Sequence, residues 1–297
     1  MSVVERAIDK LRRADPEQRK GPSLSAPGRE VIGALVETEP VNANGPRIAI
    51  NRTSLRDAGY LPEEQQDRRF AEEYRQIKRP LLAAAFAPEA ANHQQPSPRL
   101  VMMASALPGD GKTFTSINLA LSLAREKDSS VVLVDADVAK PHISRIFGVE
   151  SERGLLDALA DPALDVNTLI LPTDVNGLSI LPAGHVRDGA TELLASGRAS
   201  QLASQLLARH PRCVALFDSP PLMVSSESRA LAAAVGQIVI VVRAGHTPRD
   251  AVLKALDTLG PDRAISLVLN EGRKGVAEQL YEYGSYGDYG NGKDGAA

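Results

Sequence analysis

The chain has 297 residues, of which 43% are apolar and 4% aromatic, and its formal net charge is −3. This length and composition suit one large globular domain with extensions. The near-neutral charge and the lack of a basic stretch exclude the electrostatic footprint of a nucleic-acid-binding protein. The single cysteine, Cys213, excludes an intramolecular disulfide, and we expect it to be a small buried residue in a reducing compartment.

Residues 1–45 are predicted to form an amphipathic helix followed by a flexible linker. Val4, Ile8 and Leu11 recur at helical spacing, and the residues after them are rich in Pro, Gly, Ser, Glu and Asn. No apolar stretch reaches the length of a membrane span, and the N-terminus lacks the apolar core of a signal peptide. We therefore expect a cytoplasmic protein.

Residues 46–98 are predicted to form a short strand, a turn and a long charged helix over residues 63–86. Pro80 lies inside this helical pattern, and we expect it to kink or interrupt the helix because proline lacks an N–H group. A stretch rich in helix breakers, residues 87–99, separates this region from the next.

Residues 99–275 alternate short apolar runs with helical segments. The runs expected to be strands are residues 100–105, 130–135, 178–184, 213–218, 237–242 and 264–270. Runs that are apolar on both faces are typical of buried parallel strands. The alternation predicts an α/β fold, a doubly wound and mostly parallel sheet flanked by helices. In such a sheet, ligands bind at the carboxyl ends of the strands.

The loop after the first of these strands reads "ALPGDGKT". Gly109 and Gly111 would let backbone N–H groups turn toward phosphate oxygens, Lys112 would reach the β and γ phosphates, and Thr113 would hold Mg²⁺. Ala106 stands where the common pattern has its first glycine, so a glycine-rich turn with an incidental lysine is the alternative. The strand before the loop and the helix after it favour a phosphate-binding loop.

Two further strands end in acidic residues. Asp135 and Asp137 follow one strand, and Asp218 ends another. A single acid at a strand end is commonly a loop cap, but strand ends in a doubly wound sheet converge beside the phosphate loop. Carboxylates placed there are typical ligands of Mg²⁺, directly or through water.

Together these motifs resemble those of bacterial tyrosine kinases, the autokinases of capsule and exopolysaccharide synthesis. "ALPGDGKT", "VVLVDADVAKPH" and "ALFDSPP" look like the Walker A, Walker A′ and Walker B motifs of this family, and the resemblance runs from Arg47 to the C-terminus. "LRDAGYLPEE" and "AEEYRQIKRPLL" are most similar to the subgroup associated with exosortase. The resemblance implies a P-loop NTPase fold of the deviant Walker type.

The resemblance also implies the roles of individual residues. ATP would be bound by the loop residues Pro108, Gly109, Asp110, Gly111, Lys112, Thr113 and Phe114. Asp135 would act near the metal and the attacking tyrosine, as its base, with Asp137 in support, while Asp218 would order metal-bound water. Asp135 and Asp218 would hold Mg²⁺ together with Thr113. Asn270 would contact the nucleotide base, or else it is an ordinary polar strand end.

The segment "EEYRQIK" resembles the E-x-x-R-x-x-R helix through which family members pack into rings. Glu72 and Arg75 match this pattern, but Lys78 replaces the second arginine and cannot supply its bidentate fork. We predict self-association through this helix, with a solvated charged face as the alternative. A second departure is Ala139 in place of the arginine of D-x-D-x-R, and Lys140, which follows it, could take over a phosphate or interface role.

Residues 276–297 hold four of the six tyrosines of the chain: Tyr281, Tyr283, Tyr286 and Tyr289. In the family that the sequence resembles, such a cluster is the kinase's own substrate. Glycines between the tyrosines favour a mobile tail, and several phosphates on it would repel one another strongly. The resemblance thus implies a switch that releases phosphorylated tails from a ring. The alternative is a low-complexity tail with chance aromatic residues.

The sequence therefore predicts an ATP-dependent protein-tyrosine autokinase that regulates exopolysaccharide synthesis and export. Because the sequence shows no membrane span, the resemblance implies an integral-membrane activator as a separate partner that recruits the kinase to the inner face of the membrane. A cognate tyrosine phosphatase is a further expected partner. Two alternatives stay open, an ATPase switch of the same fold and a nucleotide-sensing scaffold. Leu107 stands where such ATPase switches have a signature lysine, which favours the kinase.

Overall fold

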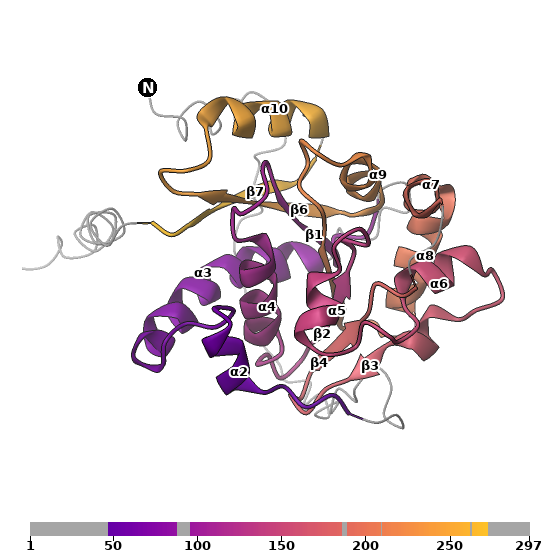
Figure 1. Ribbon diagram of the computed structural model, residues 1–297, viewed down its shortest axis with the longest axis horizontal. Coiled ribbons are helices and arrows are strands. Elements are labelled where there is room, and N and C mark those ends of the chain that lie inside the picture. Colours follow the sequence, from indigo (N-terminus) through magenta and orange to yellow (C-terminus); the bar gives the residue numbers. More distant parts are fainter. Residues whose placement is uncertain (1–46, 88–95, 186–188, 209, 262, 273–297) are drawn as a thin grey trace, which may run out of the picture.

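The computed structural model describes residues 47–87, 96–185, 189–208, 210–261 and 263–272 (Figure 1). The helix and linker predicted for residues 1–45 lie outside these ranges. Among the residues described, no helix is both long and apolar enough to span a bilayer.

A seven-stranded sheet forms the centre of the fold, in the order β3-β4-β2-β5-β1-β6-β7. The strands are β1 (Leu100–Ser105), β2 (Ser130–Asp135), β3 (Leu171–Pro172), β4 (Leu178–Leu181), β5 (Cys213–Asp218), β6 (Gln237–Arg243) and β7 (Ile265–Asn270). Every neighbouring pair is parallel except β3 and β4, which confirms the predicted doubly wound, mostly parallel sheet. The two-residue strand β3 was not predicted, because so short a segment carries no apolar pattern.

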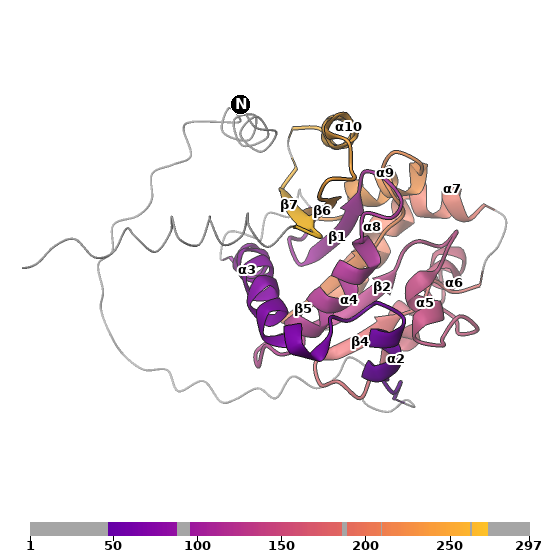
Figure 2. The same ribbon diagram turned by 60° about the vertical axis from the view of Figure 1, so that its left-hand side comes forward.

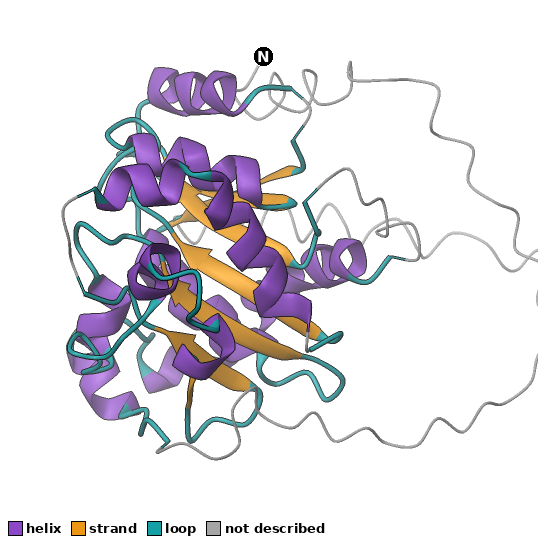
Figure 3. Ribbon diagram, turned by 90° about the vertical axis from the view of Figure 1, so that its right-hand side faces the viewer, coloured by secondary structure: helices purple, strands orange, loops and turns teal. Residues whose placement is uncertain are grey.

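Helices pack on both faces of the sheet (Figures 2 and 3). One face is covered by α2 (Arg52–Asp57), α3 (Asp67–Ala85), α4 (Lys112–Leu123) and α5 (His142–Ile146). The other face is covered by α6 (Leu155–Ala160), α7 (Ala190–Ala195), α8 (Gly197–Ala208), α9 (Ser226–Ala234) and α10 (Arg249–Leu259). Two short 3₁₀ helices, η1 (Glu64–Gln66) and η3 (Val166–Leu169), complete the elements.

The apolar core divides into two clusters because strand side chains alternate between the faces of a sheet. In β1, Val101 and Met103 join the α3–α4 side, whereas Met102 and Ala104 join the α6–α10 side. Cys213 is buried and free, as expected for a small core residue. The edge strand β7 differs from the expectation of a buried strand: Leu267 is 39% exposed and Leu269 is 60% exposed.

The region before the sheet differs from its prediction in three ways. The expected strand is a single bridge from Ile48 to Thr173, next to β3, and an unpredicted helix, α2, follows it. Helix α3 runs through Pro80, so the predicted interruption was wrong, while the predicted kink stays a prediction. Leu81 and Ala85, beyond the proline, are buried against the sheet, and this packing outweighs the missing backbone hydrogen bond.

Other helices also depart from the predicted pattern. The single helix expected over residues 191–210 is two, α7 and α8, because the chain is extended at Ser196. Helices α5 and α6 were not predicted, since five or six residues are too few to show helical periodicity.

Strand register determines which loops meet at the carboxyl edge of the sheet. Asp135 at the end of β2 is paired with Asp218 at the end of β5. Strand β1 lies between β5 and β6, so the loop that follows it lies beside both acids. Asn270, at the end of β7, is paired with Arg243 at the end of β6. The predicted motifs therefore gather at one edge.

Candidate active site

The loop that joins β1 to α4 has the geometry of a phosphate-binding loop. Gly109 and Gly111 adopt left-handed backbone conformations, with φ of 83° and 88°. Gly111 is the N-cap of α4, so the positive end of this helix faces the loop. A Cβ atom on Gly111 would lie 1.9 Å from the Nδ2 atom of Asn270 and would displace that side chain, and the left-handed backbone conformation itself favours glycine here.

Asp110 braces this loop against the neighbouring strands. Its carboxylate accepts hydrogen bonds from the Leu107 N–H at 3.1 Å and from the Thr247 hydroxyl at 2.7 Å. Its carbonyl oxygen accepts a hydrogen bond from Asn270 Nδ2 at 3.0 Å. Asn270 therefore holds the loop from the β7 side, and its predicted contact with the nucleotide base stays a prediction.

Three side chains of α4 converge on Asp218, which is wholly buried. Thr113 Oγ1 donates to Asp218 Oδ2 at 2.8 Å, and Ser116 Oγ donates to Asp218 Oδ1 at 2.9 Å. Lys112 Nζ lies 3.3 Å from the same Oδ1 atom. The structure thus joins the predicted Walker A and Walker B residues in one cluster of charges and hydroxyls.

The two acids after β2 face different surroundings. Asp135 is fully buried, and its Oδ2 atom accepts hydrogen bonds from the backbone N–H and the hydroxyl of Ser144, both at 2.7 Å. Its Oδ1 atom is buried without a partner. Burial raises the pKa of Asp135 to about 7. Asp137 lines the cavity described below, and burial raises its pKa while nearby Lys112 lowers it.

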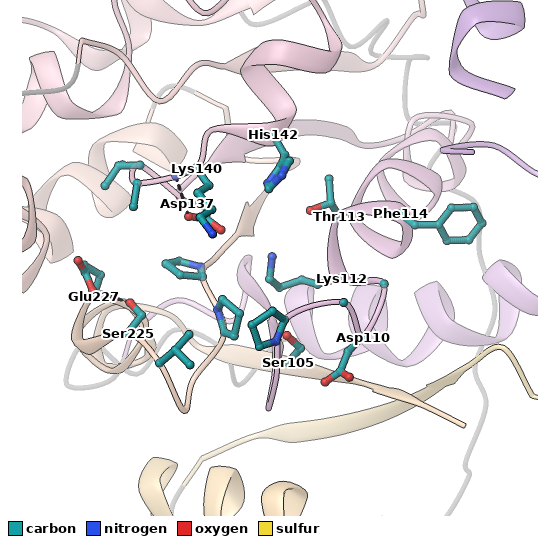
Figure 4. A pocket seen from close by; sticks show the side chains of 18 of the residues that line it. Ser105, Asp110, Lys112, Thr113, Phe114, Asp137, Lys140, His142, Ser225 and Glu227 are labelled. Carbon is teal, nitrogen blue, oxygen red and sulfur yellow. Dashed lines mark hydrogen bonds between the residues drawn. The ribbon is translucent and has the colours of Figure 1, made fainter. Parts of the chain in front are cut away.

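A cavity of about 540 Å³ lies in front of these groups (Figure 4). Its walls come from the phosphate loop, from the loop after β2 and from the loop after β5. Pro108 and Phe114, both predicted nucleotide contacts, also line it. Lys112, Asp137 and His142 point into the same space in Figure 4. A volume of this size is typical of small-ligand sites.

The oxygen-rich donor set fits Mg²⁺. Thr113 and Asp218 present a hydroxyl and a carboxylate at one place, Asp137 lies at the same cavity, and the Oδ1 atom of Asp135 is an unpaired buried acceptor. Within the described ranges no cluster of three or more His, Cys, Asp or Glu residues could hold a metal ion by itself. Mg²⁺ in nucleotide sites uses few protein ligands and completes its shell with water and phosphate oxygens.

Sequence reasoning missed three residues that shape the site. Ser116 lies one helical turn after Lys112, so helical spacing could have identified it. Ser144 belongs to the unpredicted helix α5, and Thr247 to the turn before α10. The pattern around Ser144 and Thr247 carries no signal for their contacts, which join segments far apart in the sequence.

The predicted interface residues on α3 separate into two groups. Glu72 and Arg75 are exposed and form an ion pair with each other. Lys78 is buried instead: its Nζ atom donates to the Ser122 carbonyl at 2.9 Å and pairs with Glu126 at 2.6 Å. Lys78 thus joins α3 to α4 within the subunit. The four tail tyrosines, Tyr281, Tyr283, Tyr286 and Tyr289, lie outside the described residues.

Comparisons with known proteins agree with this geometry. Residues 98–218 match a family model described as ParA, NUBPL iron-transfer P-loop NTPase. The chain is 28% identical over 192 residues to the tyrosine-protein kinase YwqD of Bacillus subtilis, covering 64% of this chain and 77% of YwqD. It is 29% identical over 195 residues to the tyrosine-protein kinase CpsD of Streptococcus agalactiae, covering 65% and 82%.

A solved structure shows the same relationship. The kinase domain of VpsO is 30% identical, with a TM-score of 0.57, over 71% of this chain and 100% of that domain. The membership of the exosortase-associated subgroup stays a prediction. The phosphate loop, the paired acids of β2 and β5, and these similarities together show that the chain belongs to the bacterial tyrosine-protein kinase family, on a nucleotide-binding P-loop fold.

Proposed function

We propose that the chain is an ATP- and Mg²⁺-dependent autokinase that phosphorylates its own C-terminal tyrosines, Tyr281, Tyr283, Tyr286 and Tyr289, and thereby regulates exopolysaccharide synthesis and export. The observation that carries this proposal is that Lys112, Thr113 and Asp137 line one cavity, while the buried Asp218 contacts both Lys112 and Thr113. These are the charges and oxygen ligands that phosphoryl transfer requires, since it depends mainly on positioning and electrostatic stabilisation.

The residues of the loop and of α4 would bind the phosphates of ATP. Gly109 and Gly111 have left-handed backbones, so N–H groups around them would turn toward the phosphates, and Lys112 would compensate the phosphate charge. Thr113, Asp218 and the acids after β2 would hold Mg²⁺, which when bound supplies positive charge that stabilises the phosphate oxygens.

In the transfer step, the phenol oxygen of a tail tyrosine forms a bond to the γ phosphorus. The bond from that phosphorus to the bridging oxygen breaks, and ADP leaves with the electron pair. The phenol proton passes to a carboxylate and then to solvent. We assign this carboxylate to Asp137 rather than Asp135, because Asp137 lines the cavity whereas Asp135 is enclosed behind it. The raised pKa of Asp137 favours proton acceptance.

The proposed regulation needs partners. We propose that an integral-membrane protein of a polysaccharide system recruits and activates the kinase, that copies of the chain associate through α3, and that a tyrosine phosphatase resets the tail. Glu72 and Arg75 on the exposed face of α3 support the proposed self-association, since exposed charged residues can pair with a second copy.

The test is phosphotyrosine mapping by mass spectrometry after the full chain is incubated with Mg²⁺ and ATP. Lys112→Met removes the charge beside the phosphates, and Lys254→Met, on the exposed surface of α10, is the matched control. We expect phosphate on the tail tyrosines in the wild type and in Lys254→Met, and none in Lys112→Met.

Two other results would replace the proposal. ATP hydrolysis that is lost in Lys112→Met but yields no phosphotyrosine would identify an ATPase switch. If neither activity occurs, alone or with a membrane activator added, the protein is a scaffold.

A further inference from the structure

One wall of the active-site cavity has no part in the proposed binding of the phosphates. Pro220, Pro221 and Val224, from the loop after β5, line the cavity together with the phosphate loop. In Figure 4, Ser225 at the end of this loop and Glu227 in the first turn of α9 lie on the opposite side of Lys112 from Thr113 and Phe114. Asn270, the predicted base contact, lines a separate groove between α3 and β7. Phe114 also lines that groove, so the wall and the groove lie on opposite sides of Lys112.

Hydrogen bonds hold this wall rigidly against the phosphate loop. The N–H group of Leu222 donates to the Ser105 carbonyl at 2.9 Å, and that of Met223 donates to the Ala106 carbonyl at 3.3 Å. Ser228 Oγ donates to the Pro220 carbonyl from the first turn of α9. The proline rings restrict the backbone further. These hydrogen bonds tie the wall to the phosphate loop that carries Gly109 and Gly111.

Of the three apolar side chains of this wall, Pro220 is buried, Pro221 is half-buried and Val224 is open to solvent, and the Glu227 carboxylate lines the cavity beside them. Val224 is 64% exposed, although it is a large aliphatic side chain at the mouth of a cavity. Lys140, in the loop after β2, and His142, at the start of α5, line the same cavity, and Lys140 is exposed. Among the described residues, no carboxylate forms an ion pair with Lys140. An apolar surface at the same cavity as an exposed cation suits a ligand with an aromatic ring and acidic neighbours.

The tail of the chain has this chemistry. Its tyrosines lie among acidic residues, including Glu282 and Asp288. A tyrosine combines a flat apolar ring with a polar hydroxyl at its tip, so a ring packed on the wall can leave its hydroxyl directed toward Lys112 and Asp137. Serine and threonine lack the ring and would gain nothing from this wall.

We propose that Pro220, Pro221 and Val224 form the subsite that holds the ring of the acceptor tyrosine, with Lys140 attracting the acidic residues beside it. This proposal rests on the proposed autokinase function and identifies the part of the site that selects tyrosine over serine and threonine. Once the ring is held, the phenol oxygen forms the bond to the γ phosphorus as ADP leaves, as described above.

The test uses one variant of the chain as the enzyme and another variant as the phosphate acceptor. The enzyme is the full chain with its four tail tyrosines changed to phenylalanine, and the acceptor is the full chain carrying Lys112→Met. Val224→Asp is introduced into the enzyme, where it places a carboxylate on the wall opposite an acidic tail. Met223→Asp is the matched control, because Met223 is exposed next to Val224 but does not line the cavity.

We expect Val224→Asp to raise the KM for the acceptor chain by about tenfold or more, with the Kd for ATP changed by less than about twofold. Met223→Asp should leave both constants unchanged. Lys140→Glu should also raise the acceptor KM, and more strongly at low salt than at high salt, because exposed charges are screened. Thermal melting of each variant shows that its fold is retained.

Three results would overturn the subsite. The first is a KM for the acceptor chain that is unchanged in Val224→Asp. The second is a rise in the Kd for ATP as large as the rise in that KM, which would assign the wall to nucleotide binding. A fluorescent peptide of residues 278–294 gives a reading that does not depend on turnover: equal binding to wild type and Val224→Asp also contradicts the proposal. If the wild-type enzyme transfers no phosphate to tyrosine, the autokinase function fails first, and this subsite fails with it.

Discussion

At the residue scale, Asp135 and Asp137 show how two acids separated by one residue can acquire different roles. Asp137 faces the cavity and Lys112, whereas Asp135 is enclosed by Ser144 and the core. The two side chains are buried to different depths because Asp135 is the last residue of β2, whereas Asp137 lies in the turn that follows the strand. The two positions look equivalent in the motif, but of the two only Asp137 lines the cavity.

Burial of Asp135 predicts a pH dependence of stability. Its pKa rises from 3.8 to about 7 in the folded state, mainly because burial disfavours the charged form. Between these pH values the folded protein keeps a proton that the unfolded chain has lost. The free energy of unfolding should therefore fall as pH rises from about 4 to about 7, by an amount on the order of a few kcal/mol.

Asp135→Asn removes this titration, so its unfolding free energy should depend less on pH over the same range. The measurement is urea denaturation without nucleotide or metal at several pH values, with Asp128→Asn on the exposed surface as the control. An unchanged slope in Asp135→Asn would show that Asp135 is ionised in the folded protein throughout this range.

At the element scale, helix α3 has two faces with different tasks. Tyr74, Lys78 and Leu81 are buried against the sheet and α4, and burial raises the pKa of Tyr74 above its ordinary value. Glu72 and Arg75 are exposed on the other face. The Gln237 side chain donates to the Leu81 carbonyl at 3.1 Å and holds the end of the helix to the start of β6.

The buried ammonium group of Lys78 should stabilise the α3–α4 contact. Lys78→Met leaves the Ser122 carbonyl without this donor, and we expect it to lower the free energy of unfolding by about 1–3 kcal/mol. Arg69→Met is the matched control, because Arg69 forms an exposed pair with Glu73 on the same helix and should contribute less than about 1 kcal/mol. Urea denaturation compares the two, and equal losses would contradict a structural role for Lys78.

At the scale of the whole molecule, the order of the strands brings the three loops of the active site together. Strand β1 lies between β5 and β6, and β5 lies next to β2, so Lys112 at the start of α4, Asp218 at the end of β5 and Asp137 after β2 share one edge of the sheet. The exposed face of α3, with Glu72 and Arg75, is then available for a second copy of the chain.

The proposed self-association predicts the effect of a charge reversal on this face. Arg75→Glu sets like charges side by side at positions 72 and 75, and we expect it to shift the sedimentation profile of the full chain toward monomers. Lys254→Glu on α10 serves as the control for the change in net charge. An unchanged profile in Arg75→Glu would place the contact between copies elsewhere.

The sequence alone determined the strands and motifs at the centre of the fold. Strands β1, β2 and β5 begin and end at the predicted residues, because buried parallel strands appear as short apolar runs between polar segments. The phosphate loop, the acids at the strand ends and the kinase family were predicted from local patterns. Such patterns describe residues close in the chain, where spacing is set by the backbone itself.

Only the tertiary structure decided what distant residues do together. Thr247 contacts Asp110 across 137 residues of chain, and Lys78 contacts Ser122 across 44. The enclosure of Asp135, the rigid wall at Val224 and the inward direction of Lys78 likewise depend on how separate elements pack. Local spacing carries no information on these contacts, because they form only when the helices close over the sheet and remove the side chains from water.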